Sequence, residues 1–154
     1  MTEISFIPSV RGGRKVLYRG FVYTKHRAGQ GGTFWHCVSR REKCKGRIQV
    51  NAAETIVEVL EGHNHLPDFR SVKAKKLIAK AKKRCIEEPH VIPSVVTQET
   101  YRTADAETLV ALPKETSIKA AIRRLRRRNL PDIPGNLESI ENVPENYQSV
   151  DNER

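Results

Sequence analysis

Two cysteines and two histidines in the first half of the chain have the spacing of a metal-binding set. Six residues separate Cys37 from Cys44, and eighteen more precede His63, which is followed by Asn64 and His65. Two thiolates and two imidazoles are the ligands that tetrahedral Zn²⁺ prefers, and four protein ligands leave no open position for catalysis. Taken singly, each residue is more simply a small buried cysteine or part of a polar turn. The four together predict a structural zinc site.

The segments that must hold these ligands are typical of short β-strands. Residues 15–23 are rich in β-branched and aromatic side chains, and residues 33–38 resume that pattern after a glycine loop at 29–32. Residues 46–50 and 55–60 alternate apolar and polar side chains on either side of a short turn. We therefore predict a four-stranded antiparallel meander. A sheet this small buries little apolar surface, and a metal would act as its staple.

The strand pattern also predicts how the ligands are presented. Residues i and i+2 of an extended strand face the same side, so His63 and His65 would direct both rings to one point. By the same rule Trp35 shares a face with Cys37 and lies in the core beside the metal, whereas His36 points to the opposite, surface side. The metal would then tie the second strand to the end of the fourth.

The charge of the chain favours a polyanionic partner. Its 154 residues carry 28 Lys+Arg and 18 Asp+Glu, for a net charge of +10. Residues 1–68 hold 11 basic and 6 acidic side chains, residues 69–130 hold 16 and 6, and residues 131–154 hold 1 and 6. Nucleic acid is the commonest partner of strongly basic zones.

Several classes of protein are excluded by the same sequence. No run of eighteen apolar residues is present, so we expect no membrane helix and no membrane partner. The first residues lack a basic stretch followed by an apolar run, so we expect no secretory signal and a chain that stays inside the cell. No arrangement of nucleophile and base and no phosphate-cradling glycine loop is found. We therefore expect no enzymatic activity and no small-molecule substrate.

The middle of the chain has the period of amphipathic helices. Apolar residues recur at three- and four-residue intervals over 69–88, with lysines between them. Cys85 falls on this apolar stripe, so we interpret it as a packed residue and not as a third thiolate ligand. A short helix is predicted over 103–111 and a strongly basic one over 117–129.

These elements combine into one prediction of fold class and domains. We expect an α+β chain in which a small zinc-stapled four-stranded antiparallel β-sheet precedes a basic helical region and an acidic C-terminal tail. The tail contains proline and glycine breakers, and we expect it to be loop or disordered. The predicted bounds are 4–67 for the stapled sheet, 69–130 for the helical region and 131–154 for the tail.

The motifs in the sheet region resemble a known family, the FLYWCH-type zinc finger. Its aromatic strand, Trp-x-Cys, second cysteine and closing His-x-His appear here at residues 20–23, 35–37, 44–48 and 62–65. The FLYWCH fold is similar to that of WRKY and GCM domains, zinc-stapled sheets that read DNA with a strand edge in the major groove. The resemblance, which covers residues 4–67, implies Zn²⁺ as cofactor and DNA as partner, although some FLYWCH modules bind proteins instead.

A second resemblance concerns the rest of the chain. Residues 108–113, 122–128 and 143–147 are similar to the stretch that follows the finger in transposases of Mutator-like elements and in proteins derived from them. In those transposases an RNase H-like catalytic domain comes later, and this chain stops before it. The resemblance implies a non-enzymatic relative of such a transposase, either a protein derived from one or a truncated form.

Two hypotheses of function follow. The first is a zinc-dependent DNA-binding protein of the nucleus that acts in transcription or chromatin. Its candidate DNA contacts are the basic residues beside Cys44 and on the first long strand: Arg14, Lys15, Arg19, Arg40, Arg41, Lys43, Lys45 and Arg47. The alternative is a nuclear protein–protein interaction module built on the same finger.

Overall fold

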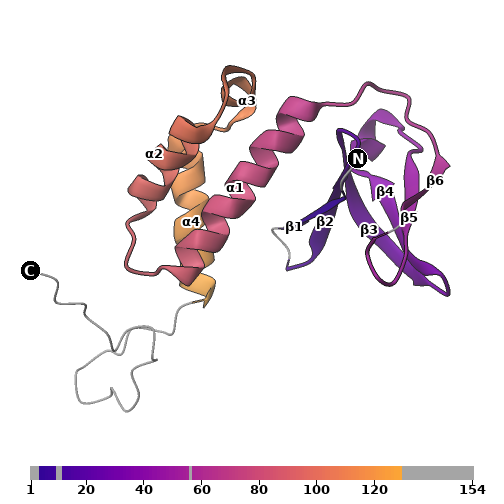
Figure 1. Ribbon diagram of the computed structural model, residues 1–154, viewed down its shortest axis with the longest axis horizontal. Coiled ribbons are helices and arrows are strands. Elements are labelled where there is room, and N and C mark those ends of the chain that lie inside the picture. The colour runs from indigo at the N-terminus through magenta and orange to yellow at the C-terminus, as the bar shows by residue number, and fades with distance from the viewer. Residues whose placement is uncertain (1–3, 10–11, 56, 130–154) are drawn as a thin grey trace, which may run out of the picture.

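The computed structural model describes residues 4–9, 12–55 and 57–129, so the predicted tail at 131–154 lies outside the described residues. The chain forms one antiparallel sheet followed by four helices (Figure 1). The strands are β1 (Ser5–Pro8), β2 (Arg14–Tyr18), β3 (Phe21–Gly29), β4 (Gly32–Cys37), β5 (Arg47–Val50) and β6 (Val57–Glu61), with a 3₁₀ turn, η1 (Val38–Glu42), after β4. The helices are α1 (Phe69–Glu87), α2 (Pro93–Thr103), α3 (Ala106–Ala111) and α4 (Glu115–Asn129).

The prediction of four strands is wrong, because the described sheet has six, ordered β1 to β6 along the chain. Residues 15–23 form two strands that meet at Arg19 and Gly20, whose φ angles are 48° and 79°. Two positive φ values are what a tight two-residue hairpin requires. The first strand escaped prediction because it is only four residues long and ends in Pro8.

One face of the sheet carries the core. Val16, Tyr23, Trp35 and Ile48 are buried there together with both cysteines of the sheet region. Phe6 of β1 covers the Trp35 ring edge-on, with 6.0 Å between ring centroids. Trp35 thus shares the core with the cysteines, as the alternation of the strand predicts.

The helices form a second core of their own. Ala81 and Cys85 of α1 pack against Val96 of α2 and against Ile118 and Ile122 of α4. Cys85 is completely buried in this cluster, in agreement with its place on the apolar stripe of the predicted helix. Within the described residues, no helix is long and apolar enough to cross a membrane.

Helix α2 is missing from the prediction, which placed a single short helix over 103–111. Its sequence is rich in threonine, and β-branched residues favour strands. In the structure the hydroxyls of Thr97 and Thr100 donate to the backbone carbonyls of Pro93 and Val96, each at 2.7 Å. Pro93 occupies the first turn, where its missing N–H costs no hydrogen bond.

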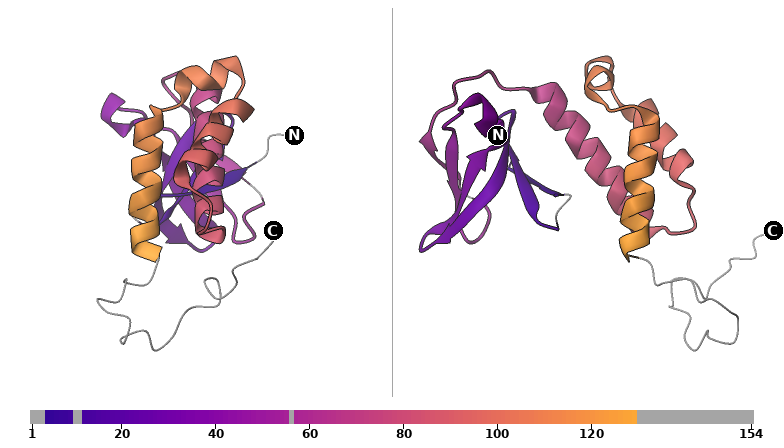
Figure 2. Two further views of the ribbon diagram at one scale, coloured as in Figure 1. Left: turned by 90° about the vertical axis from the view of Figure 1, so that its left-hand side faces the viewer. Right: turned by 180° about the vertical axis from the view of Figure 1, so that it is seen from behind.

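Helix α1 attaches the helical region to the opposite face of the sheet. Val72 packs against Leu17 and Val22 of the β2–β3 hairpin. Asp68 caps α1 by accepting from the Ser71 amide at 2.9 Å, and its own amide donates to the Gly20 carbonyl at 2.9 Å. The helices consequently lie to one side of the sheet, on the side of β1 and β2 (Figures 1 and 2).

Candidate metal centre

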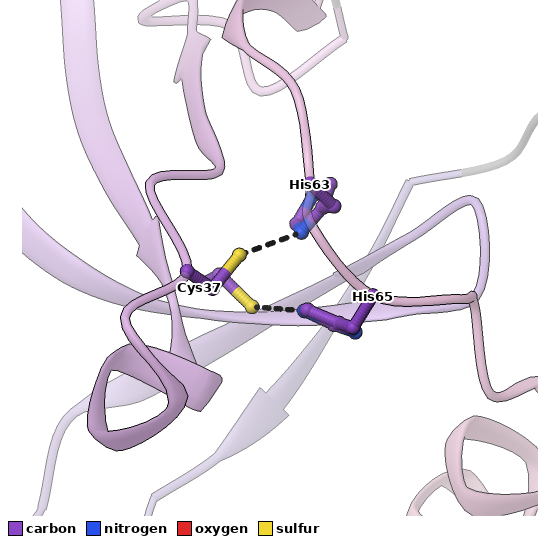
Figure 3. Close-up of side chains that lie close together, drawn as sticks. Cys37, His63 and His65 are labelled. Atoms are coloured by element: carbon purple, nitrogen blue, oxygen red, sulfur yellow. Dashed lines mark hydrogen bonds between the residues drawn. The ribbon is translucent and has the colours of Figure 1, made fainter.

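The four predicted ligands converge on one point at the end of the sheet. Cys37 ends β4, Cys44 follows η1, and His63 and His65 follow β6. Their donor atoms all lie within 4.8 Å of one another. Cys37 Sγ is 3.3 Å from His65 Nε2, and Cys44 Sγ is 3.3 Å from His63 Nδ1. Figure 3 shows the two imidazole rings directed at the sulfur atoms.

The histidines reach this point differently from the prediction. Strand β6 ends at Glu61, so His63 and His65 lie beyond the strand and not on one of its faces. Their rings are nearly perpendicular, at 81°, with centroids 5.1 Å apart. One ring faces the cluster through Nδ1 and the other through Nε2, and a shared strand face would not produce this geometry.

The donor set fits zinc. With Zn–S of about 2.3 Å and Zn–N of about 2.0–2.1 Å in a tetrahedron, sulfur and nitrogen ligands stand about 3.6 Å apart. The two sulfur–nitrogen distances of 3.3 Å are close to that value. The backbone amides of Ser39 and Gly46 point at the sulfurs of Cys37 and Cys44, at 3.5 and 3.4 Å. N–H groups aimed at sulfur stabilise the thiolate form that a metal requires.

Hydrogen bonds behind the ligands fix which nitrogen faces the cluster. His65 Nδ1 lies 3.1 Å from the Leu66 carbonyl oxygen, which only accepts, so the ring proton sits on Nδ1 and Nε2 is free for the metal. His63 Nε2 lies 2.8 Å from the Tyr23 hydroxyl, which leaves Nδ1 for the cluster. Such partners behind a ligand hold its ring in place.

Two neighbours lie directly against the His63 ring. The Phe21 ring stacks on it with 3.6 Å between centroids and 4° between planes. A side chain at Gly46 would overlap the ring too, because its Cβ would lie less than 3.0 Å from three ring atoms. Sequence reasoning did not assign Phe21, Tyr23 and Gly46 to the site. Phe21 and Tyr23 stand at positions i and i+2 of one predicted strand, and this spacing is the sequence signal that places both on one face.

Burial shapes the protonation of the ligands. It raises the pKa of the Cys37 thiol, although the Ser39 amide acts in the opposite sense. Burial, helped by the neighbouring His65, lowers the pKa of His63 and keeps that ring neutral. The neutral ring of His63 is ready to bind a cation, and the Cys37 thiol must release its proton when the cation binds.

A comparison with protein families agrees with this geometry. Residues 6–65 match the FLYWCH zinc finger domain. The match contains all four ligands, together with Phe21, Tyr23 and Gly46 that surround them. FLYWCH zinc fingers are a family of binding domains and not a class of enzymes. No curated protein matches the chain.

Half of the predicted DNA contacts lie together beside the metal site of this FLYWCH-like domain. Arg40, Lys43, Lys45 and Arg47 line a pocket of about 210 Å³ next to Cys44. All four side chains are exposed, as is that of the predicted contact Arg41. Lys43 ends η1 with a φ of 59°, which turns the chain sharply between the two cysteines.

The remaining predicted contacts do not join that cluster. Arg14 forms a two-point ion pair with Glu54, and Arg19 lies over the ring of Tyr18, 5.2 Å from its centroid. The third, Lys15, stands in the same row of the sheet as Arg47 but three strands away. The cations predicted as one group therefore occupy separate parts of the sheet.

The prediction that His36 lies at the surface is wrong. It is 7% exposed and stacks on His26, with ring centroids 4.0 Å apart. Burial, reinforced by His26, lowers the pKa of His36 and so favours the neutral ring. His36 forms a wall of the basic pocket beside Cys44 instead of a free phosphate-facing group.

Proposed function

We propose that this chain is a non-catalytic DNA-binding protein whose FLYWCH-like sheet is organised by zinc held on Cys37, Cys44, His63 and His65. The observation that carries the proposal is the group of exposed cations that flanks one of these ligands. Lys43 and Lys45 are the direct chain neighbours of Cys44. A zinc ion bound there would supply structural cross-linking and no chemistry of its own.

The metal ligands determine where the cations point. The segment between Cys37 and Cys44 is anchored at both ends by a ligand, and it carries Arg40, Arg41 and Lys43 on an exposed turn. A fixed guanidinium can bind guanine O6 and N7 through two hydrogen bonds, whereas lysine mainly attracts phosphate. Loss of the metal would release this turn, so DNA binding would depend on zinc.

The helical region would add phosphate contacts. The exposed side chains of Arg123, Arg124 and Arg127 leave α4 strongly basic. Arg126 of the same helix is not counted among these phosphate contacts, because it donates to the carbonyls of Cys85 and Val91. A basic helix of this kind also suits nuclear import, and we extend the proposal to a nuclear role in transcription or chromatin and to an origin in a Mutator-like transposase.

The experiment is selection of duplex DNA from a random pool by the full chain, zinc-loaded and chelated, near physiological salt. We expect a motif enriched only with zinc. Affinity should fall with salt by about 0.9 log units per log unit for each phosphate contact. Absence of zinc-dependent enrichment, or a flat salt response, would contradict the proposal.

A pair of matched variants tests the turn itself. Arg40→Ala with Lys43→Ala removes one arginine and one lysine beside the metal, and we expect at least about tenfold weaker binding to the selected motif. Lys25→Ala with Arg27→Ala removes the same two residue types from the exposed end of β3 and should have a smaller effect. Equal effects would show that only total charge matters.

The alternative, a nuclear protein-interaction module, is favoured by a different observation. Leu66 is 87% exposed directly after the ligand His65, and Phe69 is 58% exposed. Val59 and Leu60 of the edge strand β6 are also exposed. Substitution of Leu66 by serine should abolish partner capture in this case and leave DNA selection unchanged.

A further inference from the structure

An open groove of about 680 Å³ runs between the edge strand β1 and helices α1 and α4. Ile7, Ile86 and Leu125 contribute to its apolar floor. Six cations from the two helices also line it: Lys76, Lys80, Lys82, Lys83, Arg124 and Arg128. Among the described residues that line this groove, none is acidic. The groove thus offers an apolar surface with a rim of one charge.

Two positive charges of the rim, those of Lys82 and Arg124, repel each other. Burial, and secondly the nearby guanidinium of Arg124, lower the pKa of Lys82. Lys83 has a partner outside the groove, Glu87, at 3.6 Å. A ligand that brings carboxylates and apolar side chains together would relieve this repulsion and cover the floor.

The chain itself contains a segment of that composition. Residues 131–154 carry six acidic side chains and one basic one. Apolar and acidic residues are interleaved there: Ile133, Leu137, Glu138, Ile140, Glu141, Val143 and Glu145. The charge and the apolar content of this segment both complement the groove.

The connection to the groove is short. Helix α4 ends at Asn129, and Arg128 in its last turn already lines the groove. Pro134 is followed by Gly135, a dipeptide typical of a turn. A segment tethered directly to the end of α4 meets its site at an effective concentration of the order of millimolar, so even weak complementarity would give substantial occupancy.

From these observations we propose that the groove between β1, α1 and α4 is the docking site of the acidic segment 131–154 of the same chain. The free edge of β1 provides backbone groups to an extended segment, since β1 has a strand partner on one side only within the described sheet. Docking neutralises the basic rim. The docked segment would compete with DNA for these cations. That competition rests on the proposed function, whereas the docking itself does not.

Zero-length carbodiimide coupling of the full zinc-loaded chain tests this proposal. Equal amounts of ¹⁴N- and ¹⁵N-labelled chain are mixed, coupled and mapped by mass spectrometry. We expect Glu138, Glu141 and Glu145 to couple, within single-isotope chains, to groove lysines several times more often than to the exposed sheet lysines Lys25, Lys43 and Lys45. Coupling should decrease in high salt, which screens the ion pairs.

Several results would overturn the proposal. Coupling spread evenly over all lysines, coupling concentrated at Lys43 and Lys45, or absence of coupling would each rule out the groove as the docking site. Mixed-isotope products would place the segment of a second copy there. An acidic partner protein or DNA would then become the better candidate for the groove.

A matched pair of variants separates docking from general charge attraction. Ile86 is 41% exposed and lines the groove, and Ile92 is 62% exposed at the start of α2. Ile86→Ser should lower the coupling to the groove lysines severalfold, and Ile92→Ser should leave it unchanged. Equal yields in the two variants would show that the apolar floor plays no part, which contradicts docking. Circular dichroism of both variants checks that the helices remain folded.

Discussion

All three cysteines of the chain are buried, yet they belong to two different kinds of core. Cys37 and Cys44 of the sheet lie with two imidazoles whose donor atoms gather within 4.8 Å. Cys85 of the helical region packs among apolar side chains such as Ile118 and Ile122. Burial raises the pKa of both the Cys37 and the Cys85 thiol. Burial alone therefore does not make a cysteine a metal ligand. Other donor atoms must lie beside its sulfur.

The two halves of the chain are also stabilised by different interactions. The sheet region brings polar donors into its core, where they are costly unless something binds them. The helical region instead uses apolar packing, capped helix ends and Arg126, which holds the carbonyls at the end of α1. We expect the two halves to respond separately to metal removal and to loss of apolar contacts.

The largest effect is expected when Cys37→Ser is compared with Cys85→Ser. Zinc binding contributes about 10–16 kcal/mol in zinc-finger peptides, and this is folding free energy. Cys37→Ser should therefore lose zinc and unfold the sheet. Cys85→Ser should keep one zinc per chain and lose about 1–3 kcal/mol in the helical region. Native mass spectrometry and circular dichroism measure both, and a folded sheet in zinc-free Cys37→Ser would contradict the account.

The next largest effect is expected from a substitution in the apolar core of the helical region. Ile122 is completely buried between α1, α2 and α4. Ile122→Ala should lower the free energy of unfolding of the helices by about 2–5 kcal/mol, because it leaves a cavity. Zinc stoichiometry and sheet signals in NMR spectra should stay as in the wild type. Loss of zinc from this variant would show that the two halves fold as one unit.

A smaller effect is expected from the hydrogen bond behind His63. Tyr23→Phe removes the hydroxyl that lies 2.8 Å from His63 Nε2 while it keeps the ring. Partners of this kind alter metal affinity about 10–100-fold, so we expect weaker zinc binding in competition with a chromophoric chelator. Tyr18→Phe, in the same core cluster, is the control. Equal affinities in the two variants would exclude a role for the Tyr23 hydroxyl.

The smallest effect concerns pH and the helical half alone. Asp105 caps α3, and hydrogen bonds from Thr108 together with Lys73 lower its pKa from 3.8 to about 2. Because the folded-state pKa lies below the ordinary value, the stabilisation is complete above about pH 4 and is lost as the pH falls through about 2. The melting temperatures of wild type and Asp105→Ala should therefore converge toward pH 2. A constant difference at every pH would contradict this cause.

The ligand set was predictable from the sequence because chemistry limits it strongly. Two thiols and two imidazoles at suitable spacing have few other uses in a small domain, and the structure brings Cys37, Cys44, His63 and His65 together. The way in which the histidines reach the cluster was not predictable. It depends on where β6 ends and on the hydrogen bonds of the two rings with the Tyr23 hydroxyl and the Leu66 carbonyl, which follow from tertiary packing.

The strand count and helix α2 show where local patterns are insufficient. A tight turn at Arg19 and Gly20 interrupts an apparently continuous β-branched run. Gly20 marks a bend in the sequence, but the positive φ of Arg19 that completes the turn has no such mark. In α2, threonine hydroxyls donate to carbonyls of the preceding turn. Val96 packs into the helical core, and this tertiary packing overrides the weak helix propensity. Local sequence also could not show that Arg14 is separate from the cations beside Cys44, since its partner Glu54 lies forty positions away.

The most direct test of the account is amide hydrogen exchange of the full wild-type chain with zinc bound and after chelation. We predict that chelation removes protection from amides of β3, β4 and β5, such as Tyr23, Cys37 and Ile48, while amides around Ile118 and Ile122 in α4 stay protected. Sheet protection that survives complete removal of the metal would contradict the claim that zinc on the four ligands holds the sheet.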